Sequence, residues 1–97
     1  MYKPRRSIAL HPGEILSEIL KQNNLKQSEL ARHLGTTQVK INEICRKKRG
    51  ITPDMAMKLG KALGQNPMFW MNMQKGWEMS QLDESEYEDI EVIRLRA

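Results

Sequence analysis

The side chains best suited to a specific chemistry lie between Gln27 and Arg49, and they are hydrogen-bonding groups rather than catalytic ones. A hydroxyl, an amide and an apolar group follow one another at Thr37, Gln38 and Val39. In the major groove of DNA, a glutamine amide can pair with adenine, and an apolar group can contact the thymine methyl. This combination indicates the reading of base edges. For Val39 the alternative is an isolated surface valine, which is common.

Two short helical patterns joined at Gly35 would position these groups. Their apolar residues recur at helical spacing, at Leu30, Ala31, Leu34, Ile41 and Ile44. Gly35 suits the left-handed residue that ends a helix, and Thr36 or Thr37 can cap the next helix. Helices joined by so short a turn cross steeply, which predicts a helix-turn-helix with a second helix over about residues 37–47. The outward face of that helix then carries Thr37, Gln38, Val39, Lys40, Asn42, Glu43 and Arg46.

The distribution of charge favours a polyanionic partner. The chain has 97 residues, enough for one small domain, and residues 1–64 carry 13 Lys and Arg against 5 Asp and Glu. Residues 65–97 reverse this balance, with 3 basic and 7 acidic residues. The basic part indicates nucleic acid, whereas the acidic end is either a solvated tail or a surface for a basic partner. The single cysteine, Cys45, excludes an internal disulfide and a cysteine-based zinc finger.

The remaining patterns predict an all-α fold of five helices over residues 11–81, with an extension at each end. Residues 1–10 form a basic arm, which either contacts phosphates or is a frayed terminus. Residues 82–97 form an acidic tail, interpreted as a short strand or as a segment that becomes ordered on a partner. No apolar run approaches the roughly 20 residues that span a bilayer, and no signal peptide follows the basic start, so we expect a cytoplasmic, nucleoid-associated protein.

The fifth helical pattern carries more large apolar groups than one face of a small core can bury. Trp70, Met73 and Trp77 are spaced i, i+3 and i+7. We predict that they form a dimer interface, and the alternative is that all three belong to the core. A dimer would place two recognition helices on half-sites about one helical turn, roughly 34 Å, apart.

The sequence offers little for catalysis. The candidates for an enzymatic group are His11, His33 and Cys45. His33 is better explained as a surface residue or phosphate contact, and Cys45 as a packing residue. The chain has no glycine-rich phosphate loop, no H-E-x-x-H and no nucleophile elbow. We therefore expect no enzyme, no metal site and no cofactor.

Two sets of segments resemble known families. QSELARHLGTTQVKINEI resembles the helix-turn-helix of phage repressors of the lambda and Cro type. HPGEIL, INEICRKKRGITPDMAMKLGKALG and NPMFWMNMQKGWEM look like the HigA antitoxin family, also called virulence-associated protein I, over about residues 10–80. This resemblance implies a lambda-repressor-like fold and a homodimer that binds a palindromic operator in its own promoter. It also implies a type II toxin–antitoxin system with a HigB-type mRNA endonuclease as the toxin. The alternative is a stand-alone transcriptional regulator without a toxin.

The resemblance also assigns roles by motif position. The base-reading residues would be Thr37, Gln38, Val39 and Asn42. The phosphate-binding residues would be Gln27, Thr36, Lys40, Arg46 and Lys48. The chain departs from the common pattern at Cys45-Arg46, which bears on where the recognition helix ends. Separately, the charge of Glu43 would repel phosphate, so we expect it to pair with Lys47 one helical turn further on.

Overall fold

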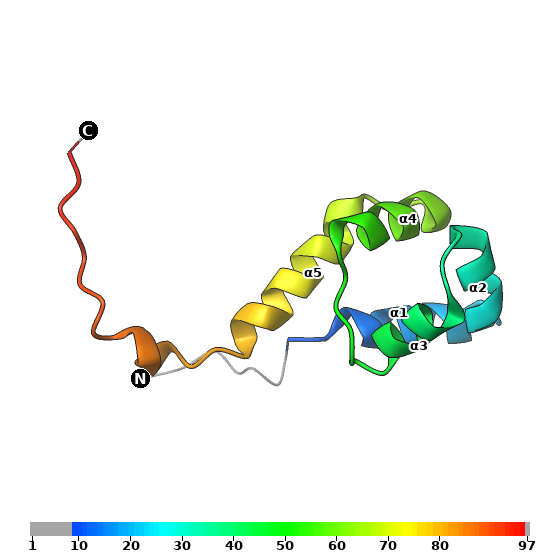
Figure 1. The fold of residues 1–97 in the computed structure, drawn as a ribbon, viewed down its shortest axis with the longest axis horizontal. Helices are drawn as coiled ribbons and strands as arrows, with labels where there is room; N and C mark the ends of the chain where they lie inside the picture. The colour runs from blue at the N-terminus through cyan, green and yellow to red at the C-terminus, as the bar shows by residue number, and fades with distance from the viewer. Residues whose placement is uncertain (1–8, 97) are drawn as a thin grey trace.

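The structure, a computed structural model, describes residues 9–96 and contains five α-helices and one short 3-10 helix (Figure 1). No strand occurs within the described residues. The prediction of an all-α, five-helix fold is therefore confirmed, whereas the proposed arm at residues 1–10 lies almost wholly outside the described range. The elements are α1 (Pro12–Gln22), α2 (Gln27–Leu34), α3 (Gln38–Cys45), α4 (Pro53–Leu63), α5 (Pro67–Ser80) and η2 (Glu84–Tyr87).

The ends of the helices follow from local side-chain chemistry. Thr37, Thr52 and Asn66 cap α3, α4 and α5, because each side-chain oxygen accepts a backbone N–H from the first helical turn, at 3.2, 3.2 and 2.9 Å. α2 ends at Gly35, whose φ of +72° is a left-handed conformation that glycine adopts without steric cost. The turn between α2 and α3 is therefore fixed by the residues at its two ends.

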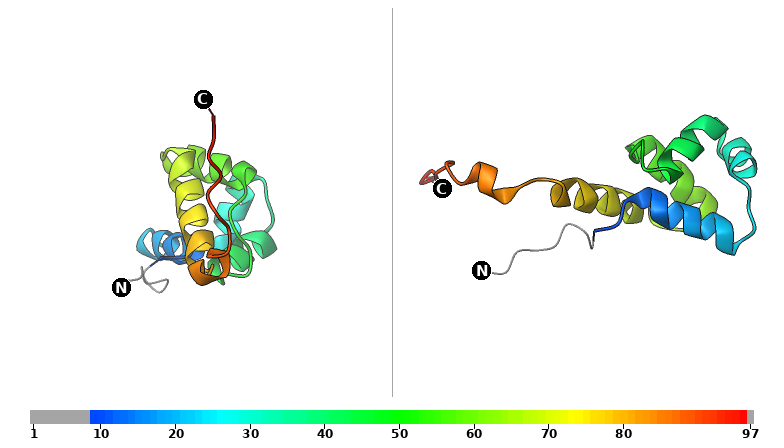
Figure 2. Two further views of the ribbon diagram at one scale, coloured as in Figure 1. Left: turned by 90° about the vertical axis from the view of Figure 1, so that its left-hand side faces the viewer. Right: turned by 90° about the horizontal axis from the view of Figure 1, so that it is seen from below.

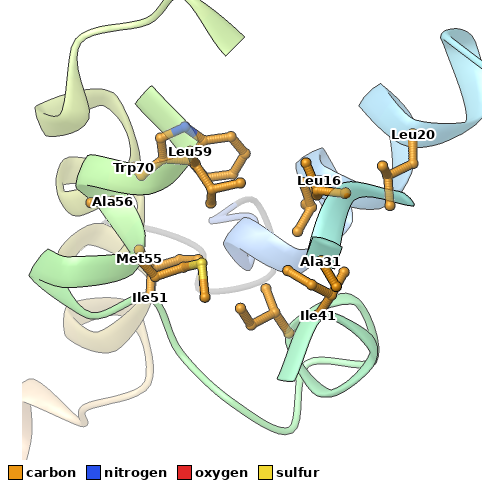
Figure 3. Packing of buried hydrophobic residues seen from close by; sticks show 11 residues of the cluster. Leu16, Leu20, Ala31, Ile41, Ile51, Met55, Ala56, Leu59 and Trp70 are labelled. Carbon is orange, nitrogen blue, oxygen red and sulfur yellow. The ribbon is translucent and has the colours of Figure 1, made fainter. Parts of the chain in front are cut away.

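One core holds the five helices together. α3 packs against α1 and α2, while α5 packs against α4 and α1 (Figures 1 and 2). Figure 3 shows the buried side chains pointing from all of these elements toward a common centre. The core residues are Leu16, Leu20, Leu30, Ala31, Ile41, Ile44, Ile51, Met55, Ala56, Leu59 and Trp70. Since α1 contacts both α3 and α5, it connects the helix-turn-helix to the last helix.

The assignment of Trp70 to a dimer interface is wrong. Its side chain is 0% exposed within a single chain, and its indole N–H donates to Oε1 of Gln65 at 2.7 Å. Met73 is half-buried and packs against the same core. Trp77 is also half-buried, with its ring edge against His11 at a centroid distance of 4.7 Å. The core alternative therefore describes Trp70, whereas for Met73 and Trp77, which are partly exposed, a place in a dimer interface stays a prediction.

His11 has a structural role that the sequence analysis missed. The ring is 2% exposed, and its Nδ1 accepts the backbone N–H of Gly13 at 2.9 Å, while the Glu14 carboxylate accepts the N–H of His11 at 3.2 Å. These reciprocal hydrogen bonds form a capping box at the start of α1. Burial lowers the pKa of His11 most strongly; Glu14 opposes this and Lys47 adds to it. The capping hydrogen bond requires a neutral ring, because a protonated Nδ1 cannot accept.

After α5, the chain leaves the helical bundle and does not form the strand considered for the tail (Figure 1). Beyond η2, residues 88–96 are irregular. Ile90, Val92, Ile93 and Leu95 in this segment are 73–96% exposed. In residues 9–96, the helices are too short or too polar to cross a bilayer.

Replacing Trp70 by alanine is expected to destabilise the fold severely. The change removes a large side chain from a fully buried site, which typically lowers the free energy of unfolding by about 3–5 kcal/mol. Urea denaturation followed by circular dichroism would measure it. Met57→Ala is the matched control, since Met57 is 51% exposed and a change within about 1 kcal/mol is expected there. Equal losses in the two variants would show that Trp70 is not in the core.

Stability is expected to fall in mild acid because of His11. The folded-state pKa lies below the unfolded-state value of about 6.5, so the unfolded chain binds the proton more readily. The free energy of unfolding should therefore be fully retained above pH 6.5 and decrease as the pH falls toward the folded-state pKa. Urea midpoints at about pH 7.5 and about pH 5.5 would measure the slope. In His11→Asn, which can cap without titrating, the slope should be smaller; an unchanged slope would contradict the assignment.

Candidate nucleic-acid interface

The first turn of α3 presents its side chains to solvent. Gln38, Val39 and Lys40 are exposed, and Val39 is 64% exposed despite being apolar. Ile41 and Ile44, on the opposite side of the helix, are 0% exposed. The two buried isoleucines fix the rotation of α3 about its axis, because turning either one outward would empty part of the core. The predicted outward orientation of Gln38, Val39 and Lys40 is therefore confirmed.

Thr36 and Thr37, in the turn between α2 and α3, each have a structural role and differ in their exposure to solvent. Thr36 is half-buried, and its backbone N–H donates to the carbonyl of Ala31 at 2.9 Å, which closes the end of α2. Thr37 is exposed, and its Oγ1 accepts the N–H of Lys40 at 3.2 Å. This cap uses an oxygen lone pair and leaves the hydroxyl proton available. Thr37 can therefore hold the helix start and still donate a hydrogen bond outward.

A hydrogen bond joins the two helices of the motif at the same surface. Nδ2 of Asn42 on α3 donates to Oε1 of Gln27, the first residue of α2, at 3.1 Å. The two residues have different expected roles, base reading for Asn42 and phosphate binding for Gln27, and this hydrogen bond brings them together. Because Gln27 uses its oxygen for this contact, its amide nitrogen remains available as a donor, which is the group that a phosphate oxygen requires. The bond also restricts the orientation of the Asn42 amide.

The cationic segment Arg46–Arg49 follows α3 and is tightly turned. The helix ends at Cys45, two residues before the predicted end at residue 47, because Lys47 adopts a left-handed φ of +65°. The backbone N–H groups of Lys47 and Lys48 donate to the carbonyls of Ile44 and Glu43, at 3.0 and 2.8 Å. This reversal keeps the cations close to α3 instead of extending them along its axis.

The expected ion pair between Glu43 and Lys47 is wrong. Glu43 instead binds the guanidinium of Arg49, whose Nε and Nη2 lie 2.8 and 2.7 Å from its Oε1. The ammonium of Lys47 lies 3.9 Å from the carboxylate of Glu14 on α1. The i, i+4 relationship holds only inside a helix, and α3 has already ended at Lys47. Since Arg49 neutralises Glu43, the carboxylate on the recognition face repels an anion less than its sequence position indicates.

Exposed cations lie at both ends of α3. Lys40, Arg46 and Lys48 are all exposed, and Lys40 lies on α3 itself. The surface thus offers amide and hydroxyl groups for specific hydrogen bonds and ammonium and guanidinium groups for phosphate. A flat base edge framed by phosphates presents the complementary pattern of acceptors and negative charge.

Neither cysteine nor histidine chemistry is built into this surface. Cys45 is half-buried, and burial raises the pKa of its thiol more than a hydrogen bond from Ser17 lowers it, so the thiol is the dominant form at neutral pH. His33 is exposed on α2. Within residues 9–96, no group of three His, Cys, Asp or Glu side chains is close enough together to hold a metal ion.

Comparison with known proteins gives a consistent classification. A family model described as Helix-turn-helix matches residues 16–70. Virulence-associated protein I of Dichelobacter nodosus is 40% identical over 88% of this chain and 79% of its own length. A HigA-family addiction module antidote protein from Coxiella burnetii superimposes with a TM-score of 0.82 at 30% identity, covering 88% of this chain and 98% of that one.

A second solved structure contains DNA. It is the Pseudomonas aeruginosa protein PA4674 in complex with its operator DNA, with a TM-score of 0.80 and 34% identity over 87% of this chain and 96% of that one. The matched family model spans α2 and α3 completely, and the similarity to the relatives extends over most of the chain. The chain therefore belongs to the non-enzymatic helix-turn-helix family, within the group that includes virulence-associated protein I and the HigA-type antitoxins.

Proposed function

We propose that this protein is the antitoxin of a type II toxin–antitoxin system and represses its own promoter by binding a palindromic operator as a dimer. The observation that carries the proposal is the exposed first turn of α3, with Gln38 and Val39 outward, next to the Gln27–Asn42 hydrogen bond. The similarity to PA4674, which was solved in complex with its operator DNA, supports operator binding by this chain.

Four residues, on α3 and at its N-cap, would select the bases. Gln38 can form two hydrogen bonds with adenine, and such a bidentate pair contributes about 1–3 kcal/mol of discrimination. Val39 would contact a thymine methyl, which explains an apolar residue that is 64% exposed. Thr37 and Asn42 would donate to or accept from neighbouring bases. Asn42 would do so from the orientation that Gln27 imposes on it.

Phosphate contacts would come from residues on both sides of this reading face. Gln27 and Thr36 lie at the start and just beyond the end of α2, and Lys40, Arg46 and Lys48 lie on or after α3. The side-chain amide nitrogen of Gln27 and the three cations would bind phosphate oxygens and fix the register of α3 in the groove. Binding of these cations to phosphates would release counterions from the DNA, and a higher salt concentration opposes that release. The affinity should therefore fall steeply as the salt concentration rises.

The outward side of α5 is a better dimer surface than the residues predicted from the sequence. Met68, Asn72, Gly76 and Met79 are exposed and recur at helical spacing, and we call them the outer stripe of α5. A Cβ added at Gly76 would have nothing within 4 Å, so nothing in the single chain requires a glycine. Glycine inside a helix costs about 1 kcal/mol relative to alanine. Close approach of the same helix from a second copy would explain it.

The partner toxin would be a HigB-type mRNA endonuclease. The acidic tail, with six acidic and two basic residues in residues 82–96, is a candidate contact for a basic protein of this kind. Co-expression of the tagged protein with the product of the neighbouring gene would test this partner. Failure to recover that product, together with intact operator binding, would leave a stand-alone regulator.

Operator binding can be tested directly by fluorescence anisotropy. Purified protein would be titrated onto DNA from the region upstream of its own gene and onto a scrambled duplex, at two salt concentrations. We expect selective binding that weakens by orders of magnitude between about 50 and about 200 mM salt. Weak binding that is equal on both duplexes would reject the proposed function.

Replacing Gln38 by alanine should weaken operator binding and relax base selection without affecting the fold. The expected loss is about 1–3 kcal/mol on the operator, with little change on scrambled DNA, because the side chain contacts a base edge. Lys40→Ala is the matched control, since losing a phosphate contact should weaken both duplexes alike. An unchanged ratio of operator to scrambled affinity in Gln38→Ala would contradict the assigned role.

Replacing Gly76 by leucine should separate dimerisation from folding. The added side chain points into open space in the single chain, so the monomer fold should be retained or slightly stabilised, while close contact between two outer stripes is blocked. Light scattering would report the mass in solution. Lys61→Leu, at an exposed position of α4 outside the outer stripe, should remain a dimer. A Gly76→Leu variant that is still fully dimeric would place the interface elsewhere.

A further inference from the structure

Gln74 is a polar residue on the buried side of α5, one helical turn after Trp70. It is 4% exposed, and both ends of its amide are used. Its Oε1 accepts the backbone N–H of Ile51 at 2.7 Å, and its Nε2 donates to Oε2 of Glu78 at 2.7 Å. The bond to Ile51 spans 23 positions of the chain, so it joins two parts of the fold that are distant in sequence.

The absence of a side chain at Gly50 leaves room for the Gln74 amide. A Cβ added at Gly50 would lie 2.7 Å from Nε2, 2.8 Å from Oε1 and 2.9 Å from Cδ of Gln74. Such distances are shorter than real Cβ atoms adopt, so any larger residue would displace the amide. Gly50 is not in a left-handed conformation that would itself favour glycine. The space required by Gln74 therefore accounts for a glycine at this position.

The contact joins α5 to the connection that leaves the recognition helix. Gly50 and Ile51 follow the cationic segment Arg46–Arg49 directly. On its other side this segment is attached to α3 through Glu43, which binds the guanidinium of Arg49. The main packing of α5 is against α4 and α1. The Gln74 amide thus supplies a direct polar link from α5 to the segment between α3 and α4.

We propose that Gln74 is a positioning residue that fixes the Arg46–Arg49 segment relative to the outer stripe of α5. In the dimer of the proposed function, on which this inference rests, the outer stripe lies at the twofold axis. The Gln74 link would then set the distance between the two cationic segments and restrict the half-site spacing that the dimer accepts.

The amide nitrogen of Gln74 is held by the charged side chain of Glu78. Glu78 accepts from Gln74 and from the ammonium of Lys75, the latter at 3.3 Å. The hydrogen bond from Gln74 lowers the pKa of Glu78 most strongly, with a smaller contribution from Lys75, so Glu78 is an ionised acceptor at neutral pH. With its nitrogen held by Glu78, the amide presents its oxygen to Ile51. A carboxylate could accept this N–H but could not also donate to Glu78, and an apolar side chain could do neither.

The test uses full-length Gln74→Met, which keeps the approximate volume and removes both hydrogen bonds. Wild type and variant would be titrated onto operators with the native half-site spacing and with one base pair removed or added, a change of about 3.4 Å and about 35° in half-site position. We expect wild type to lose about tenfold or more in affinity off the native spacing. For Gln74→Met we expect about tenfold weaker binding at the native spacing and a difference of less than about threefold among the three spacings.

Gln65→Met is the matched control. It also removes a short side-chain hydrogen bond to α5, the one accepted from the indole of Trp70 at 2.7 Å, and this bond involves neither Gly50 nor Ile51. All titrations would be made at a temperature where each variant is fully folded by circular dichroism. Gln65→Met should keep the wild-type dependence on spacing. A wild-type dependence in Gln74→Met, or the same flattening in Gln65→Met, would overturn the proposal.

A second measurement needs no DNA and separates this inference from the proposed function. Amide hydrogen exchange at Ile51 should accelerate by about tenfold or more in Gln74→Met relative to Gln65→Met of similar stability, because Ile51 loses its acceptor. Unchanged exchange at Ile51 would overturn the link even if operator binding is normal. If wild type does not distinguish operator from scrambled DNA, the proposed function fails, and the exchange rate still decides whether Gln74 holds the segment.

Discussion

The recognition helix depends on the burial of two isoleucines. α3 has eight residues, and a helix of that length is not stable by itself in water. Ile41 and Ile44 are 0% exposed, and their contacts with the rest of the core, together with the Thr37 cap, hold α3 in place. The same contacts determine its rotation and therefore bring Gln38 and Val39 to the surface. The proposed base-reading surface is thus a consequence of packing on the opposite side of the same helix.

The cationic segment after α3 is held more firmly than a charged loop usually is. A left-handed residue at Lys47 turns the chain back, and the Arg49–Glu43 ion pair attaches the turn to α3. Gln74 attaches the following residues to α5. Exposed ion pairs contribute little to stability, typically below 1 kcal/mol. For the proposed phosphate contacts, the value of these interactions lies in geometry, because cations that are already in place lose less conformational entropy when they bind.

The two sides of α5 have different surroundings. Trp70 and Gln74 face the core. The hydrogen bond from the N–H of Ile51 to Gln74 connects α5 to the chain between α3 and α4, which leads to the proposed DNA-binding surface. The outer stripe faces solvent and includes Met68 and Met79, which are 53% and 68% exposed. A helix with apolar residues on both sides is suited to join a domain core to a second copy, and the position of Gly76 is consistent with close helix packing there.

Apart from the end of α3, the sequence by itself determined where the helices begin and end and which way α3 faces. Prolines, capping residues and Gly35 act through contacts within a few residues, so their effects can be predicted without the fold. The tertiary structure decided the rest. Periodicity showed that Trp70, Met73 and Trp77 share a side of α5, but not that this side meets the core. The signal for Gln74 was present as a polar residue one turn after Trp70, yet its partner is 23 positions away.

The same distinction explains why the ion pair of Glu43 and the burial of His11 were not predicted from the sequence. Glu43 has Arg49 as its partner because the chain turns at Lys47, and helical spacing no longer applies beyond that point. His11 precedes a proline and lies three residues before Glu14, which is the local pattern of a capping box. Its burial against Trp77, however, exists only because α1 and α5 pack together. Interactions within one helical turn are encoded locally, whereas those between helices depend on how the whole chain closes around its core.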